Sequence, residues 1–126
     1  MKKTLLPLLV FLLFAFQAFG EYNRDAVVKA MRNNVAQLNA MKAAAASSDF
    51  DAAAEAIWSL AEGMKSIRGY TPPKGDTAGW NKTIDDLVVA AYMGIGACGE
   101  KNAGNLNQAI AELSAFSKTG HSQFRG

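Results

Sequence analysis

Cysteine, histidine and proline are scarce in this chain of 126 residues, which contains one Cys, one His and three Pro. A single cysteine, Cys98, cannot form a disulfide within the chain, so no disulfide framework holds the fold together. A single histidine, His121, excludes zinc sites built from several imidazoles, unless carboxylates complete them. The sequence also lacks a nucleophile and base arrangement and a phosphate-binding glycine loop. These absences predict a protein that is not an enzyme.

Only one apolar run is long, and it lies at the start of the chain, from Leu5 to Phe16. This run is shorter than the ~20 residues that a membrane-spanning helix needs. Two lysines precede it, and small residues lie three and one positions before Glu21, which is the pattern of a cleaved secretory signal peptide. We therefore predict a signal peptide over residues 1–20, a single domain over residues 21–126, a periplasmic location and no permanent membrane anchor.

The predicted domain has no excess of positive or of negative charge. The whole chain has a formal net charge of +2, and Lys2 and Lys3 of the predicted signal peptide account for it. Removing these two from the 13 basic residues leaves 11, which equals the 11 acidic residues. A nucleic acid or an anionic membrane would call for a basic surface, so neither is expected as a partner.

Beyond residue 22 the apolar residues recur every three or four positions, and no segment alternates as a strand would. This periodicity predicts four helices, at about 23–46, 50–68, 80–98 and 105–124. The segment GYTPPKGDTAG, between the second and third, breaks the pattern with two prolines and three glycines. Four helices with mostly short connections predict an all-α fold, an antiparallel up-down-up-down four-helix bundle.

The first and last helices bring two unusual side chains to the same end of this bundle. The stripe expected to face inward in the first helix consists of Val28, Met31, Val35, Leu38 and Ala45. The stripe in the fourth runs through Leu106, Ala109, Ile110, Leu113, Phe116 and Ser117 to His121 and Phe124. Because neighbouring helices are antiparallel, Met31 and His121 are expected to face each other. A thioether and an imidazole so placed can hold a haem iron.

Simpler interpretations remain open for both residues. Gly120 precedes His121, and glycine costs a helix interior about 1 kcal/mol relative to alanine. The fourth helix would then end near Thr119 with Gly120 as its cap, leaving His121 on a frayed tail. Met31 would be core filler, the usual role of methionine at helical spacing. Cys98 lies on the inward stripe of the third helix and is interpreted as a small buried hydrophobe.

Three short stretches resemble the four-helix-bundle cytochromes. SKTGHSQFR is similar to the haem-attachment motif of cytochromes c′, Cys-x-x-Cys-His followed by two residues, an aromatic and an Arg, with Ser117 and Gly120 in place of the cysteines. RDAVVKAM, from Arg24 to Met31, is similar to the Arg with a Met seven residues on in the first helix of that family. The TPPK at residues 71–74 also occurs between the second and third helices of soluble cytochrome b562, a relative that binds haem without a covalent link.

The resemblance implies roles for six residues. His121 matches the haem-ligating histidine, Arg125 an arginine near the haem and Arg24 an arginine near a haem propionate. Val28 falls at the position that faces the open side of the haem, and Met31 is a candidate second iron ligand. The residues implied in haem binding are thus His121, Met31, Arg24, Val28, Phe124 and Arg125, of which His121 and Met31 would contact the metal.

The missing cysteines decide the kind of haem protein that the resemblance implies. Without two thiols no thioether bonds to the porphyrin can form, so any haem is of b type and held non-covalently. The implied function is electron transfer or haem carriage, with a redox partner protein and a homodimer. The alternative is a bundle descended from cytochromes c′ that has lost haem and serves as a structural or partner-binding protein.

Overall fold

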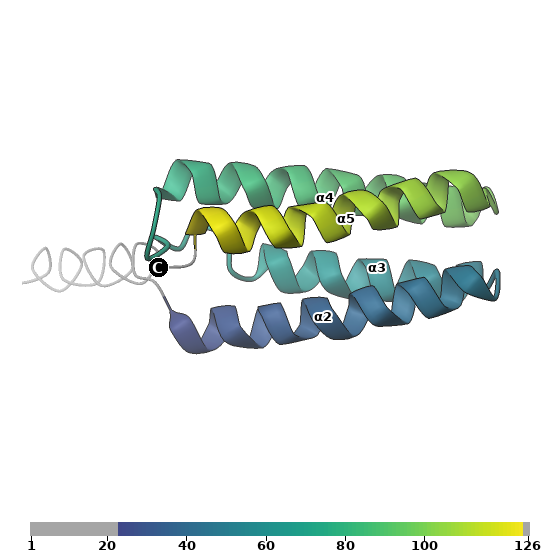
Figure 1. Cartoon of the computed structure of the whole chain (residues 1–126), viewed down its shortest axis with the longest axis horizontal. Coiled ribbons are helices and arrows are strands. Elements are labelled where there is room, and N and C mark those ends of the chain that lie inside the picture. The colour runs from purple at the N-terminus through teal and green to yellow at the C-terminus, as the bar shows by residue number, and fades with distance from the viewer. Residues whose placement is uncertain (1–22, 125–126) are drawn as a thin grey trace, which may run out of the picture.

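The computed structural model describes residues 23–124, except for the side chains of residues 121–123. It contains four helices, α2 (Arg24–Ala46), α3 (Phe50–Lys65), α4 (Thr77–Gly99) and α5 (Ala103–Phe124), and this part of the chain has no strand. Figure 1 shows them side by side as an antiparallel bundle. The predicted all-α, up-down-up-down four-helix bundle is confirmed. The predicted signal peptide and Arg125 lie outside the described residues.

Each helix packs against its two neighbours in the order α2, α3, α4, α5, and α5 closes the bundle against α2. The contact between α2 and α5 is the smallest of the four. The first turn of α2 and the last turn of α5 lie at the same end of the molecule, together with the connection from α3 to α4 (Figure 1). The backbones of α2 and α5 therefore approach each other at fewer positions than those of any other neighbouring pair of helices.

Side-chain caps determine where the helices begin. In each case an Asn or Asp oxygen accepts a hydrogen bond from the backbone N–H three residues further on, at 2.7 to 3.1 Å. The capping residues are Asn23, Asp49, Asp76 and Asn102. Such a cap contributes about 1 kcal/mol. Helix α4 begins three residues earlier than predicted, and α5 two residues earlier, because Asp76 and Asn102 cap them within segments that had been predicted to be loop.

Helix α3 ends at Lys65, earlier than the predicted residue 68. The chain then turns at Gly69, whose φ of 94° favours glycine. Ile67 remains fully buried in this turn, and its carbonyl oxygen accepts a hydrogen bond from Trp80 Nε1 at 2.8 Å. The turn is thus fixed to the first part of α4 although it is not helical.

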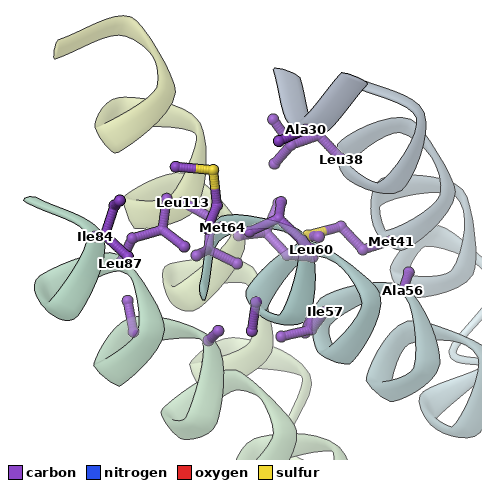
Figure 2. Close-up of a cluster of buried hydrophobic side chains, with 14 of the residues drawn as sticks. Ala30, Leu38, Met41, Ala56, Ile57, Leu60, Met64, Ile84, Leu87 and Leu113 are labelled. Atoms are coloured by element: carbon purple, nitrogen blue, oxygen red, sulfur yellow. The ribbon is translucent and has the colours of Figure 1, made fainter. Parts of the chain in front are cut away.

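The core runs along the whole bundle axis, and Figure 2 shows its central part. Its largest fully buried side chains are Met41, Ile57, Leu60, Ile67, Ile84, Leu106 and Leu113. Burial of one such side chain contributes about 1.5–3 kcal/mol. The inward stripe predicted for the fourth helix is confirmed at Leu106, Ala109, Ile110, Leu113 and Phe124, and Cys98 of α4 is buried as expected. Burial raises the pKa of the Cys98 thiol, which keeps it in the neutral form.

The predicted inward stripe of the first helix is partly wrong. The buried residues of α2 are Val27, Ala30, Asn34, Leu38, Met41 and Ala44. Val35 is 56% exposed, and Val28 and Met31 are only half-buried. The physical reason is that α2 is rotated so that Ala30, Asn34, Leu38 and Met41 face the neighbouring helices, which moves the buried side of the helix away from Val28 and Val35. The valines at 28 and 35 therefore lie beside the core and not within it.

Candidate functional site

Helix α5 continues without a break through Gly120 to Phe124. The interpretation in which it ends near Thr119 is therefore wrong, and His121 is a helical residue. The last turn is anchored by Phe124, which is 7% exposed and whose ring meets Trp80 edge to face, with the ring centroids 5.3 Å apart. This aromatic contact ties the end of α5 to the start of α4 and offsets the helix-weakening effect of Gly120.

The position of His121 around α5 follows from residues whose contacts are known. Ala109 marks the side facing α4, since its Cβ lies 3.1 Å from where a Cβ on Gly94 would be. At about 100° per residue, Ser114 is roughly 140° around the helix from Ala109, and His121 follows Ser114 by two turns. Ser114 therefore lies on the side of α5 that is directed away from α4, towards α2. Position 121 follows it two turns further along the helix, but the His121 side chain, and with it the prediction that it faces Met31, lies outside the described residues.

The same reasoning places three predicted residues of α2. Asn33 marks the side facing α3, because its Nδ2 donates a hydrogen bond to the backbone oxygen of Ser59 at 3.2 Å. Arg24, Val28 and Met31 lie about 140° to 180° around the helix from Asn33. They are thus on the side of α2 next to α5, where Arg24 is exposed and the other two are half-buried. The structure thus places Arg24, Val28 and Met31 beside the seam between α2 and α5, at the end of the bundle where α5 ends.

Asn34 is the one buried polar or charged residue of the described part, with 3% of its surface exposed. Its Nδ2 lies 2.9 Å from the sulfur of Met64 and 3.7 Å from the sulfur of Met31. In Figure 2 the Met64 side chain lies between Leu113 of α5 and the Ala30 and Leu38 side chains of α2. Two thioether sulfurs and an amide thus gather where α2, α3 and α5 meet.

Two buried polar side-chain atoms, one of them in this cluster, have no hydrogen-bond partner among the described residues. They are Oδ1 of Asn34 on α2 and Oγ of Ser114 on α5. An unsatisfied buried acceptor or donor costs about 1–3 kcal/mol, and such atoms in a native protein point to a water molecule or another bound group. They occur on α2 and α5, the two neighbouring helices that contact each other least.

Asn34, Met64 and Ser114 were not anticipated from the sequence. A signal for Asn34 exists, because it lies four residues after Ala30 and four before Leu38, in the middle of a helical apolar stripe. Met64 lies at helical spacing with the apolar residues of α3, which is the ordinary pattern of a core methionine. Ser114 has no comparable signal, because a serine beside a core leucine is common on helix surfaces. Its burial depends on how α5 is rotated against α2.

Two other features, a carboxylate, thiol or imidazole metal cluster and a membrane-spanning helix, are not found in the part of the chain that the structure describes. It contains no group of three or more His, Cys, Asp or Glu side chains that could hold a metal ion. No helix among residues 23–124 is long and apolar enough to cross a membrane. Among the residues predicted for the site that lie within 23–124, Arg24 is the only one with a permanent charge. The candidate site is thus an apolar seam with thioether, amide and hydroxyl groups.

Comparisons of the chain with protein-family models, with curated proteins and with solved structures found no match. The resemblance to cytochromes c′ and cytochrome b562 therefore depends on the three short stretches quoted above. The four-helix fold is compatible with that resemblance, but it is shared by many bundles of other function.

Proposed function

We propose that this chain is a four-helix haem protein of b type, similar to cytochromes c′ and cytochrome b562, and that it serves in electron transfer or haem carriage. Haem would lie between α2 and α5, at the end of the bundle where α2 begins. One observation carries the proposal. The backbones of α2 and α5 approach each other at fewer positions than those of any other neighbouring pair, and these two helices carry the buried polar atoms, Asn34 Oδ1 and Ser114 Oγ, that have no hydrogen-bond partner among the described residues.

The residue types assigned to this seam, a histidine and a methionine, suit a haem group. An imidazole and a thioether are an established pair of axial ligands, and the half-buried sulfur of Met31 has only a 3.7 Å contact with an amide. A thioether is a weak hydrogen-bond acceptor, so this contact is readily exchanged for a stronger one. The exposed Val35 and half-buried Val28 add apolar surface to the same side of α2.

Each residue would contribute by ordinary chemistry. His121 would bind the iron, with Met31 or an open position opposite. Arg24 lies in the first turn of α2 and is exposed, where a guanidinium can pair with a propionate through two parallel donors. Val28 and Phe124 would supply apolar contact, and Arg125 is assigned by resemblance alone. The bound haem would supply one-electron redox chemistry. Export to the periplasm and a redox partner protein are part of the proposal.

A haem-free structural or partner-binding bundle is the second candidate, and one contact favours it. Phe124 is packed against Trp80, and Trp80 is hydrogen-bonded to Ile67. Protein side chains thus already occupy the core at the end of the bundle. If they leave no room for a porphyrin, the seam between α2 and α5 holds only ordered water.

Titration with hemin separates the two candidates. The protein purified after expression of the full chain is mixed with increasing hemin, and the visible spectrum is recorded with and without reductant. We expect a saturable Soret band that shifts on reduction and is lost in His121→Ala. Met31→Leu should alter the reduced spectrum, whereas Met93→Leu, at a methionine 67% exposed on α4, is the matched control and should change nothing.

Two results would contradict the haem proposal. One is the absence of saturable binding at micromolar hemin. The other is a spectrum that His121→Ala leaves unchanged, since adventitious hemin on an apolar surface needs no particular histidine. Either result favours the haem-free bundle.

A further inference from the structure

The outer face of α4 carries no charge over most of its length. The sequence has no charged residue between Asp86 and Glu100. Within that stretch Val89 is 58% exposed, Met93 67% and Tyr92 43%. The exposed faces of the other three helices carry Lys, Arg, Asp or Glu at intervals. An uncharged apolar face of this length on one helix of a bundle is typical of a surface that another molecule covers.

These residues form one continuous surface with a side chain from α3. Val89, Tyr92, Met93 and Gly96 are spaced by three and four residues, so they follow one stripe of α4. Trp58 of α3 is 51% exposed, and the centroid of its ring lies 6.2 Å from that of Tyr92. A Cβ on Gly96 would meet no atom within 4 Å. We call this set, Trp58, Val89, Tyr92, Met93 and Gly96, the α4 patch.

The size of the α4 patch suits the centre of an interface. Large apolar side chains present about 150–250 Å² each, so with these exposed fractions the patch offers roughly 400 Å². A standard interface buries about 800 Å² on each partner, with an apolar centre and a polar rim. Charged side chains of α3 border the patch as such a polar rim would. Lys65 Nζ lies 3.1 Å from Glu62 and 3.3 Å from the Tyr92 hydroxyl.

We propose that the α4 patch is the centre of a two-fold interface with a second copy of this chain. In a two-fold contact the patch of one subunit packs against the same patch of the other, so a net charge on the patch would make the two subunits repel each other. The side chains of this patch carry no charge, and two opposite pairs lie beside it on α3 and α4, Lys65 with Glu62 and Lys82 with Asp86. A strongly charged partner would find no complementary charge here. Gly96, which has no side chain, lets a second α4 approach closely.

The patch lies on α3 and α4, whereas the candidate haem site lies between α2 and α5. A dimer formed through the α4 patch therefore leaves the seam between α2 and α5 open. The proposal does not depend on haem binding. Each proposal can fail while the other holds.

Sedimentation velocity tests the dimer directly. The haem-free protein, purified after expression of the full chain, is examined from about 1 to 200 µM, a range that detects micromolar association. We expect a reversible dimer whose Kd rises at least about tenfold in Val89→Lys and in Met93→Lys, because each buries a charge in the apolar centre. Val35→Lys is the matched control, since Val35 is 56% exposed but lies on α2, and its Kd should be unchanged.

The circular dichroism spectrum of each variant shows that the helices are retained. A wild-type protein that stays monomeric over the whole range would overturn the proposal. So would a dimer that Val89→Lys and Met93→Lys leave intact, or one that Val35→Lys weakens as much as they do. In the last two cases the copies meet through another face, or through apolar contact without a defined geometry.

Discussion

Asn34 donates its side-chain Nδ2 to the sulfur of Met64 across the interface of α2 and α3, at 2.9 Å, while its Oδ1 has no partner among the described residues. Only 3% of the Asn34 surface is exposed. A bundle could place an apolar residue here at lower free-energy cost, because a buried amide must satisfy both of its ends. The residue thus makes the haem-free bundle less stable beside the candidate site.

Asn34→Leu should stabilise the haem-free protein. The substitution removes an unsatisfied oxygen and supplies apolar contact of similar shape, which we expect to raise the free energy of unfolding by about 1 kcal/mol. For a domain of this size that corresponds to a rise in Tm of about 4–8 °C. Asn39→Leu, at an exposed position of the same helix, is the control for helix propensity and should gain less. A loss of stability in Asn34→Leu would show that the amide is satisfied by ordered water.

Gly120→Ala tests the continuation of α5. In a regular helix alanine is favoured over glycine, and a Cβ here would meet no atom within 4 Å, so stability should rise by about 0.5–1 kcal/mol. Gly75→Ala is the opposite control, since Gly75 has a φ of 84° and alanine is strained there. Urea unfolding of both variants measures the difference. A destabilised Gly120→Ala would mean that α5 ends at this residue in solution.

Gly94→Ala and Gly96→Ala should act in opposite directions although both lie in α4. A Cβ on Gly94 would lie 3.1 Å from Ala109 Cβ and 3.1 Å from Ile57 Cδ1, so these neighbours would have to shift by a few tenths of an ångström. We expect a net loss of about 1 kcal/mol there, because overpacking exceeds the gain in helix propensity. Gly96→Ala should gain up to about 1 kcal/mol. Unfolding is followed at low micromolar protein, and equal effects of the two substitutions would contradict the close approach of α4 to α5.

Asp85 should titrate below its ordinary range. Arg68 holds its carboxylate through two bonds, from Nε at 2.8 Å and from Nη2 at 3.0 Å, and this hydrogen bonding lowers the pKa of Asp85. Because the folded-state pKa lies below the unfolded one, the stabilisation is present above the ordinary value of 3.8 and is lost as the pH falls through the lower folded-state value. Carbon-13 NMR of the carboxyl group measures the pKa, which should return towards the ordinary range in Arg68→Gln. An identical titration in both proteins would show that the pair is open in solution.

Much of the candidate site could be anticipated because it depends on helical spacing. Given four antiparallel helices, Met31, Arg24 and Val28 must lie near the start of one helix and His121 near the end of its neighbour. Asn34 and Ser114 were not anticipated, because their burial depends on the rotation of α2 and α5 about their own axes. That rotation is set by contacts with α3 and α4.

The sequence by itself determined the four helices and their antiparallel order, because apolar periodicity, capping residues and the break at residues 69–79 act over a few residues of chain. Only the tertiary structure decided which face of α2 is buried, since an alanine-rich helix offers two similar stripes and its neighbours select Val27 and Asn34 over Val35. It also decided that α5 passes through Gly120. The local preference against glycine is small, and the packing of Phe124 on Trp80, residues far apart in the chain, outweighs it.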